Sequence, residues 1–210
     1  MNLALLSDQD SPSSQAAIKR LIGHLNLDST TAAYIASMPD PDRIFFRNTQ
    51  AIYRSSGIDL DTYIDLETGF SEALMEEVLQ KPLIHLSGGD TFRFLHSLKA
   101  RKLEKSLTEF AKKGGALIGV SAGAMLMTPS IESARLCGDQ NRIELNDLSA
   151  LNLVDFQFTP HATKNSNERE AAKQLANKHK KSIFLCSDGE GILQLDDCVS
   201  ILGEPVQVKA

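Results

Sequence analysis

The chain has 210 residues, of which 42% are hydrophobic and 23% charged, with a formal net charge of −5 at pH 7. This composition is typical of one soluble globular domain, and the negative charge argues against nucleic acid or an anionic membrane as a main partner. We expect no membrane span, because no apolar run approaches the ~20 residues that a spanning helix needs. We also expect no signal peptide, and three cysteines without metal-ligand spacing predict a reduced, cytoplasmic setting.

Apolar runs of strand length alternate with amphipathic helical stretches over the first 120 residues. Strands are predicted over 2–6, 31–36, 59–66, 82–86 and 116–120, and helices over 13–25, 42–53, 71–79, 91–98 and 103–113. Such alternation indicates crossover units, and therefore an α/β fold with a mostly parallel central sheet and helices on both faces.

The C-terminal part follows a different pattern of short strands with few helices between them. Strands are predicted over 156–159, 182–186, 191–195, 199–202 and 206–208, and the chief helix over about 167–179. A mixed sheet edge or a terminal hairpin fits this pattern. Because no linker or repeat divides the chain, residues 1–210 are expected to form a single domain.

A Gly-x-Ser-x-Gly pattern centred on Ser121 follows the buried strand predicted over 116–120. Glycines at 119 and 123 would let the backbone close tightly between strand and helix while the Ser121 Oγ stays exposed. This layout predicts a nucleophile elbow, with the serine near the positive end of a helix. The same pattern also arises by chance in loops of small residues.

A nucleophilic serine needs a base and an acid that orients the base. Among five histidines, His161 follows a predicted strand end, where sites in open α/β sheets gather, but the residues alone leave its role open. His24 and His179 are expected to be solvated and His85 to lie in the core, whereas His96 could be surface or packing. The candidate acids are Asp155, Asp188, Glu190, Asp196 and Asp197, and Asp188 is expected chiefly as a turn residue.

A glycine-rich turn, Ser87-Gly88-Gly89-Asp90-Thr91-Phe92, joins a strand to a helix. Its free backbone N–H groups could stabilise a developing oxyanion together with the N–H of Ala122, the residue after the nucleophile. Phosphate binding is the alternative, but the turn matches neither a Rossmann fingerprint nor a P-loop.

These motifs, with Ser121-Ala122-Gly123-Ala124 and Thr159-Pro160-His161, resemble the aspartyl dipeptidase (dipeptidase E) and cyanophycinase family of serine peptidases over most of the chain. The resemblance implies a fold like that of class I glutamine amidotransferases and a Ser-His-Glu triad without a metal or cofactor. Carried over to this chain, it makes Ser121 the nucleophile, His161 the base, and Glu190 the third member. Gly89 and Ala122 become the oxyanion donors.

The resemblance also implies substrate contacts at Gly88, Asp90 and Arg169, the last as a reader of an acidic side chain. Arg169 could equally be a helix-surface residue. The chain departs from the family at Arg135-Leu136, where some members carry an acidic residue proposed for the relay, and in a shorter stretch after His161.

The predicted function is therefore a serine exopeptidase that hydrolyses short peptides, with an N-terminal aspartate as the candidate preference, as a monomer or homodimer. Two alternatives stay open: cyanophycinase-like or other acyl hydrolysis, and a non-catalytic binding module with the same fold.

Overall fold

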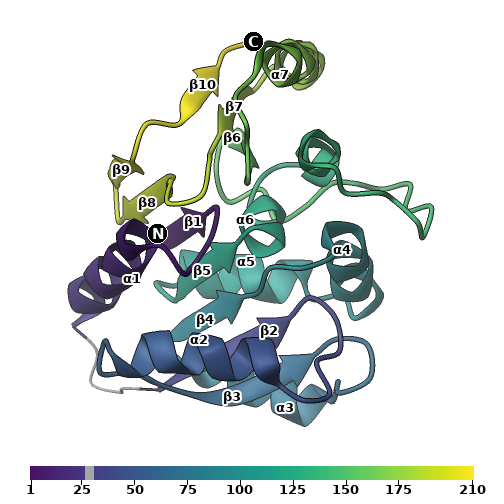
Figure 1. Cartoon of the computed structure of the whole chain (residues 1–210). Helices are drawn as coiled ribbons and strands as arrows, with labels where there is room; N and C mark the ends of the chain where they lie inside the picture. Colours follow the sequence, from purple (N-terminus) through teal and green to yellow (C-terminus); the bar gives the residue numbers. More distant parts are fainter. Residues whose placement is uncertain (27–30) are drawn as a thin grey trace.

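The structure is a computed structural model that describes residues 1–26 and 31–210. Its main sheet has seven strands in the order β3-β2-β4-β5-β1-β8-β9 (Figure 1). The strands from β3 to β1 in this order run parallel, whereas β8 and β9 run antiparallel to their neighbours. They are β1 (Asn2–Leu6), β2 (Thr31–Ala36), β3 (Asp59–Asp65), β4 (Leu83–Leu86), β5 (Ala116–Val120), β8 (Gly191–Leu195) and β9 (Cys198–Leu202).

Helices cover both faces of this sheet because its strands are apolar on both sides. Along β1, Leu3 and Leu5 pack into one core while Ala4 and Leu6 pack into the other. The first core includes side chains of α3 (Glu72–Gln80), α4 (Thr91–Ala100), α5 (Glu104–Lys112) and α6 (Ala122–Leu126). The second includes side chains of α1 (Pro12–Leu25) and α2 (Ile44–Arg54). The predicted α/β class with a mostly parallel sheet is confirmed.

A second, three-stranded sheet has the order β10-β7-β6 and stands to one side of the main sheet with α7 (Figure 1). Its elements are β6 (Phe156–Thr159), α7 (Ser166–His179), β7 (Ser182–Leu185) and β10 (Val206–Val208), and a 3₁₀ helix, η1 (Ile131–Cys137), precedes them. The expected short C-terminal strands are therefore divided: β8 and β9 form an antiparallel edge of the main sheet, and β6, β7 and β10 pair separately.

The chain segments that follow β1, β4 and β5 lie together because these strands are parallel neighbours in the sheet. Backbone hydrogen bonds link them: the Ser121 N–H donates to the Leu6 carbonyl, and the Gly123 N–H donates to the Ser87 carbonyl. Within the residues that the structure describes, none of the helices is long and apolar enough to cross a membrane.

Candidate active site

Ser121 lies on a strained turn between β5 and α6. Its φ of +50° and ψ of −108° are unusual for a residue with a side chain. The turn is so tight that a Cβ on Gly119 would lie 2.5 Å from the Gly123 carbonyl carbon, and a Cβ on Gly123 would overlap the Leu86 carbonyl. Only glycine fits at these two positions without displacing backbone, which agrees with the spacing of the motif.

His161 follows β6 and its ring reaches Ser121. The distance from His161 Nε2 to Ser121 Oγ is 3.0 Å. The His161 backbone has a φ of +54°, and its N–H donates to the Oγ of Ser7 at 2.8 Å. The next residue, Ala162, donates its N–H to the Cys186 carbonyl. Contacts with the segments after β1 and β7 therefore hold the end of β6 beside β5.

Asp188 completes a hydrogen-bonded chain of three side chains. Its Oδ1 lies 2.6 Å from His161 Nδ1 and also accepts a hydrogen bond from the Ser7 hydroxyl at 3.0 Å. Ser7 is fully buried, and its hydroxyl is hydrogen-bonded to both His161 and Asp188. These two bonds fix the positions of His161 and Asp188. Sequence reasoning missed Ser7; its one signal is its place directly after a buried strand, at the sheet edge that also carries Ser87 and Ser121.

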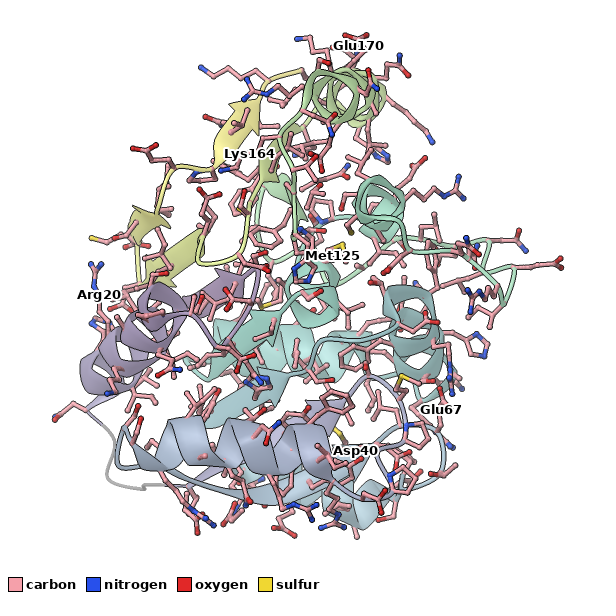
Figure 2. All side chains as sticks on the ribbon, viewed as in Figure 1. Arg20, Asp40, Glu67, Met125, Lys164 and Glu170 are labelled. Atoms are coloured by element: carbon pink, nitrogen blue, oxygen red, sulfur yellow. The ribbon has the colours of Figure 1, made fainter. Side chains whose placement is uncertain are left out.

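The expectation that Glu190 lies beside His161 is wrong. Its carboxylate pairs with the Lys164 ammonium at 2.6 Å and accepts the N–H groups of Ser187 and Glu204. The physical reason is a tight turn, closed by the Glu190 N–H donating to the Ser187 carbonyl at 3.0 Å. Asp188 and Glu190 lie two residues apart on this turn, and their carboxylates point in different directions, that of Asp188 to His161 and that of Glu190 to Lys164. Lys164 lies with the C-terminal strands in Figure 2.

Gly88 lies next to Ser121, and Gly89 follows it in the turn after β4. A Cβ on Gly88 would lie 3.5 Å from the Ser121 Cβ, and Gly89 has a φ of +131°. The Ser37 hydroxyl donates to the Gly88 carbonyl at 2.6 Å and fixes the loop. Across residues 1–26 and 31–210, the N–H groups of Gly89 and Ala122 donate to no acceptor. They are therefore available to an external oxygen.

The structure does not bring Asp90 or Arg169 to the space beside Ser121. Asp90 caps α4 by accepting the Arg93 N–H at 2.9 Å. Arg169 is exposed on α7, where its Nε donates to the Lys164 carbonyl at 2.7 Å. Arg169 is therefore a residue of the helix surface, the second of the two positions that the sequence left open for it.

A cavity of about 450 Å³ opens beside Ser121 and His161. It is lined by the segments that follow β1, β2 and β4 and by the start of α2, where Asp40 lies (Figure 2). Tyr34 and His85 contribute stacked rings, with centroids 5.1 Å apart. Burial raises the pKa of Tyr34 to about 12 and lowers the pKa of His85 to about 3, so both rings are neutral near pH 7.

No group of three or more His, Cys, Asp or Glu side chains in the described part of the chain is arranged to hold a metal ion. The groups that converge on Ser121 are an imidazole, a carboxylate and backbone N–H donors. Such an arrangement can activate a hydroxyl and stabilise an oxyanion.

Comparison with known proteins agrees with this chemistry. The model of peptidase family S51 matches residues 3–202. An uncharacterised peptidase of Pasteurella multocida (strain Pm70) is 27% identical over 164 residues, which cover 78% of each chain. Peptidase E of Escherichia coli O1:K1 / APEC is 36% identical over 81 residues, covering 39% of this chain and 34% of that protein. A solved structure from Listeria monocytogenes EGD-e, provisionally identified as a peptidase E, has a TM-score of 0.73 at 25% identity, covering 95% of this chain and 96% of that one.

Proposed function

Because the chain belongs to peptidase family S51 and is a peptidase, we propose that it hydrolyses short peptides as a serine exopeptidase, through Ser121, His161 and Asp188. The observation that carries this proposal is the hydrogen-bonded chain from Ser121 Oγ to His161 Nε2 and from His161 Nδ1 to Asp188 Oδ1. A neutral imidazole held in this way accepts a proton at Nε2 while its Nδ1–H donates to the carboxylate.

In the first step, His161 removes the proton from Ser121 as Oγ attacks the scissile carbonyl carbon. The carbonyl oxygen becomes an oxyanion, and the N–H groups of Gly89 and Ala122 donate to it. Asp188 holds the imidazole in the tautomer with a proton on Nδ1 and stabilises the positive charge on the protonated ring. The strained turn at Ser121 supports this role, because it presents Oγ at the end of β5 as a nucleophile elbow does.

The intermediate then collapses. The bond between carbonyl carbon and nitrogen breaks, and His161 gives its proton to the leaving amine. The acyl group stays on Ser121 Oγ. A water molecule, deprotonated by His161, attacks the acyl carbon. The bond from this carbon to Oγ then breaks, His161 returns the proton to Oγ, and the carboxylic acid product and free Ser121 are released. The proposed reaction uses only side chains, backbone groups and water.

The substrate proposal extends to short peptides but not to an N-terminal aspartate. Arg169, the residue expected to read an acidic side chain, lies on the surface of α7. Among the described residues that line the cavity beside Ser121, there is no lysine or arginine. A preference for aspartate is therefore supported only by the family resemblance, and not by the residues that line the cavity.

The test is replacement of the nucleophile. Ser121→Ala removes Oγ and should abolish hydrolysis of every dipeptide in a mixed panel, while thermal unfolding stays close to wild type. The wild-type protein should also react with a fluorophosphonate, forming a bond from Oγ to phosphorus with loss of fluoride, and Ser121→Ala should not. Wild-type turnover by Ser121→Ala would refute the mechanism. A non-catalytic module would show neither labelling nor turnover.

A further inference from the structure

The cavity beside Ser121 differs in chemistry from a site for an acidic substrate. We propose that it selects peptides by an uncharged, apolar side chain on the residue whose carbonyl Ser121 attacks, and that it rejects an acidic side chain there. This inference rests on the proposed function, because it assigns the cavity to the acyl side of that reaction.

The position of the cavity indicates which part of the substrate enters it. His161 comes from β6 and approaches Ser121 from the β1 side of the sheet, so the leaving amine must lie on that side to receive its proton. The oxyanion faces Gly89 and Ala122. The cavity reaches from Ser7 and Asp8 after β1 to the segment after β2 and the start of α2. Tyr34 and Phe45 line this second end, which lies away from β1 in the strand order. The attacked carbon carries the leaving amine, the oxygen and the acyl residue. With the first two placed elsewhere, the side chain of the acyl residue is the part of the substrate that enters the cavity.

The inner wall of the cavity is aromatic and uncharged. Tyr34 and His85 are 3% and 1% exposed, and the Tyr53 hydroxyl lies 2.9 Å from His85 Nδ1. With its Nδ1 so occupied and its ring neutral, His85 offers no positive charge to a substrate carboxylate. Ala36 and Val120 add further apolar lining. Pockets of this kind bind apolar side chains by removing them from water.

Two large apolar side chains line the cavity yet stay in contact with solvent. Phe45 at the start of α2 is 69% exposed, and Met38 in the segment after β2 is 38% exposed. An apolar substrate side chain in the cavity would cover part of both and gain from that burial. An acidic side chain would lose hydration without a new partner.

Among the described residues that line the cavity, the aspartates, lysines and arginines are represented by acidic groups alone: Asp8, Asp10 and Asp40. Burial alone would raise the pKa of Asp8, but hydrogen bonds from Gly189 and Ser11 outweigh it and hold the pKa below its ordinary value. Asp40 accepts the N–H groups of Ile44, Phe45 and Phe46. These carboxylates repel an acidic substrate. Asp8 and Asp40 already accept hydrogen bonds from backbone N–H groups. These two carboxylates therefore attract a lysine side chain of the substrate less than their negative charge suggests.

The experiment compares dipeptides of the form X-Ala, with X as Leu, Phe, Lys or Asp, and the reversed peptide Ala-Leu. We expect kcat/KM for Leu-Ala and Phe-Ala to exceed that for Asp-Ala by about tenfold or more. Leu-Ala should also exceed Ala-Leu. The inference is overturned if Asp-Ala or Lys-Ala is the best substrate, or if Ala-Leu is hydrolysed faster than Leu-Ala.

Two pairs of variants locate the selectivity. Phe45→Ala should raise KM for Leu-Ala several-fold, whereas Ile44→Ala, an exposed neighbour that does not line the cavity, should not. Asp10→Lys should raise kcat/KM for Asp-Ala, and Asp42→Lys should leave it unchanged, because Asp42 is exposed and does not line the cavity. Equal effects within either pair would contradict the assignment.

Labelling separates failure of this inference from failure of the proposed function. Protection of Ser121 against a fluorophosphonate is measured with the boronic acid analogues of leucine and aspartate. Stronger protection by the leucine analogue supports the inference even without turnover, and stronger protection by the aspartate analogue overturns the inference alone. Absence of labelling and of turnover overturns the proposed function and this inference with it.

Discussion

Ser121 and His161 share a backbone feature that few residues with side chains adopt. Their φ angles are +50° and +54°, in the region that favours glycine. Such conformations cost of order 1–3 kcal/mol each and persist only where the surroundings fix them. The fixing contacts are the Leu6 carbonyl, which accepts the Ser121 N–H, and the Ser7 hydroxyl, which accepts the His161 N–H. The last residue of β1 and the residue that follows it thus hold Ser121 and His161 in place.

Two carboxylates on one turn allow a matched test of the third member of the proposed triad. Asp188→Asn should lower kcat by about 10²–10⁴-fold, because an amide can hold the imidazole in the wrong tautomer and cannot stabilise its positive form. Glu190→Gln should keep kcat within about threefold of wild type but lower the free energy of unfolding, because Glu190 pairs with Lys164, at 13% and 17% side-chain exposure. Steady-state kinetics and urea unfolding measure the two effects. The opposite order of activities would assign the role to Glu190.

At the scale of elements, the contact between α6 and β4 sets the geometry of the turn. The Gly123 backbone packs directly against Leu86, so an added methyl group has no space. Gly123→Ala should therefore lower the free energy of unfolding by about 1–3 kcal/mol and impair turnover, because α6 must move away from β4.

Gly23 in α1 supplies the control for this prediction, since a Cβ there meets nothing within 4 Å. Gly23→Ala should raise the free energy of unfolding by about 0.5–1 kcal/mol through better helix propensity, with turnover unchanged. Denaturant unfolding of both variants checks the pair. A similar change in both would show that the turn tolerates a side chain at position 123.

Sequence patterns predicted the elements better than the contacts between them. Alternating apolar runs identified the parallel strands, and the glycine spacing around Ser121 matched a turn with no room for side chains. The choice between Asp188 and Glu190 depends on the direction in which a tight turn projects each side chain, which composition does not encode. The cavity was missed because Tyr34, Phe45 and Ser121 come to line one cavity only through the strand order, which the alternation of strands and helices does not determine.

On the scale of the whole molecule, buried neutral His85 ties stability to pH. Its pKa is about 3 in the folded protein against an ordinary value of 6.5. The unfolded chain therefore binds the proton first, and the stabilisation is complete above pH 6.5 and is lost as the pH falls toward 3. The loss approaches about 1.4 kcal/mol per pH unit below 6.5.

His85→Gln should remove this dependence between pH 5 and 6.5, although its stability at pH 7 is lower because the ring contact with Tyr34 is lost. This window lies above the ordinary pKa values of the aspartates and glutamates, 3.8 and 4.5, so carboxylates contribute little to the slope. Urea unfolding at several pH values checks it, with exposed His96→Gln as the control that keeps the wild-type slope. Parallel curves for His85→Gln and wild type would exclude His85 as the cause.

The place of β1 between β5 and β8 has a consequence for how the protein is made. β1 leaves the ribosome well before its partner β8, which begins at residue 191. At ~5–20 residues per second, translation separates the two by about 10–40 s. Through that interval Ser7 has neither Asp188 nor the Cys186 carbonyl to bond. A nascent chain that already carries Ser121 and His161 therefore cannot complete the three-residue hydrogen-bonded chain until Asp188 has been added.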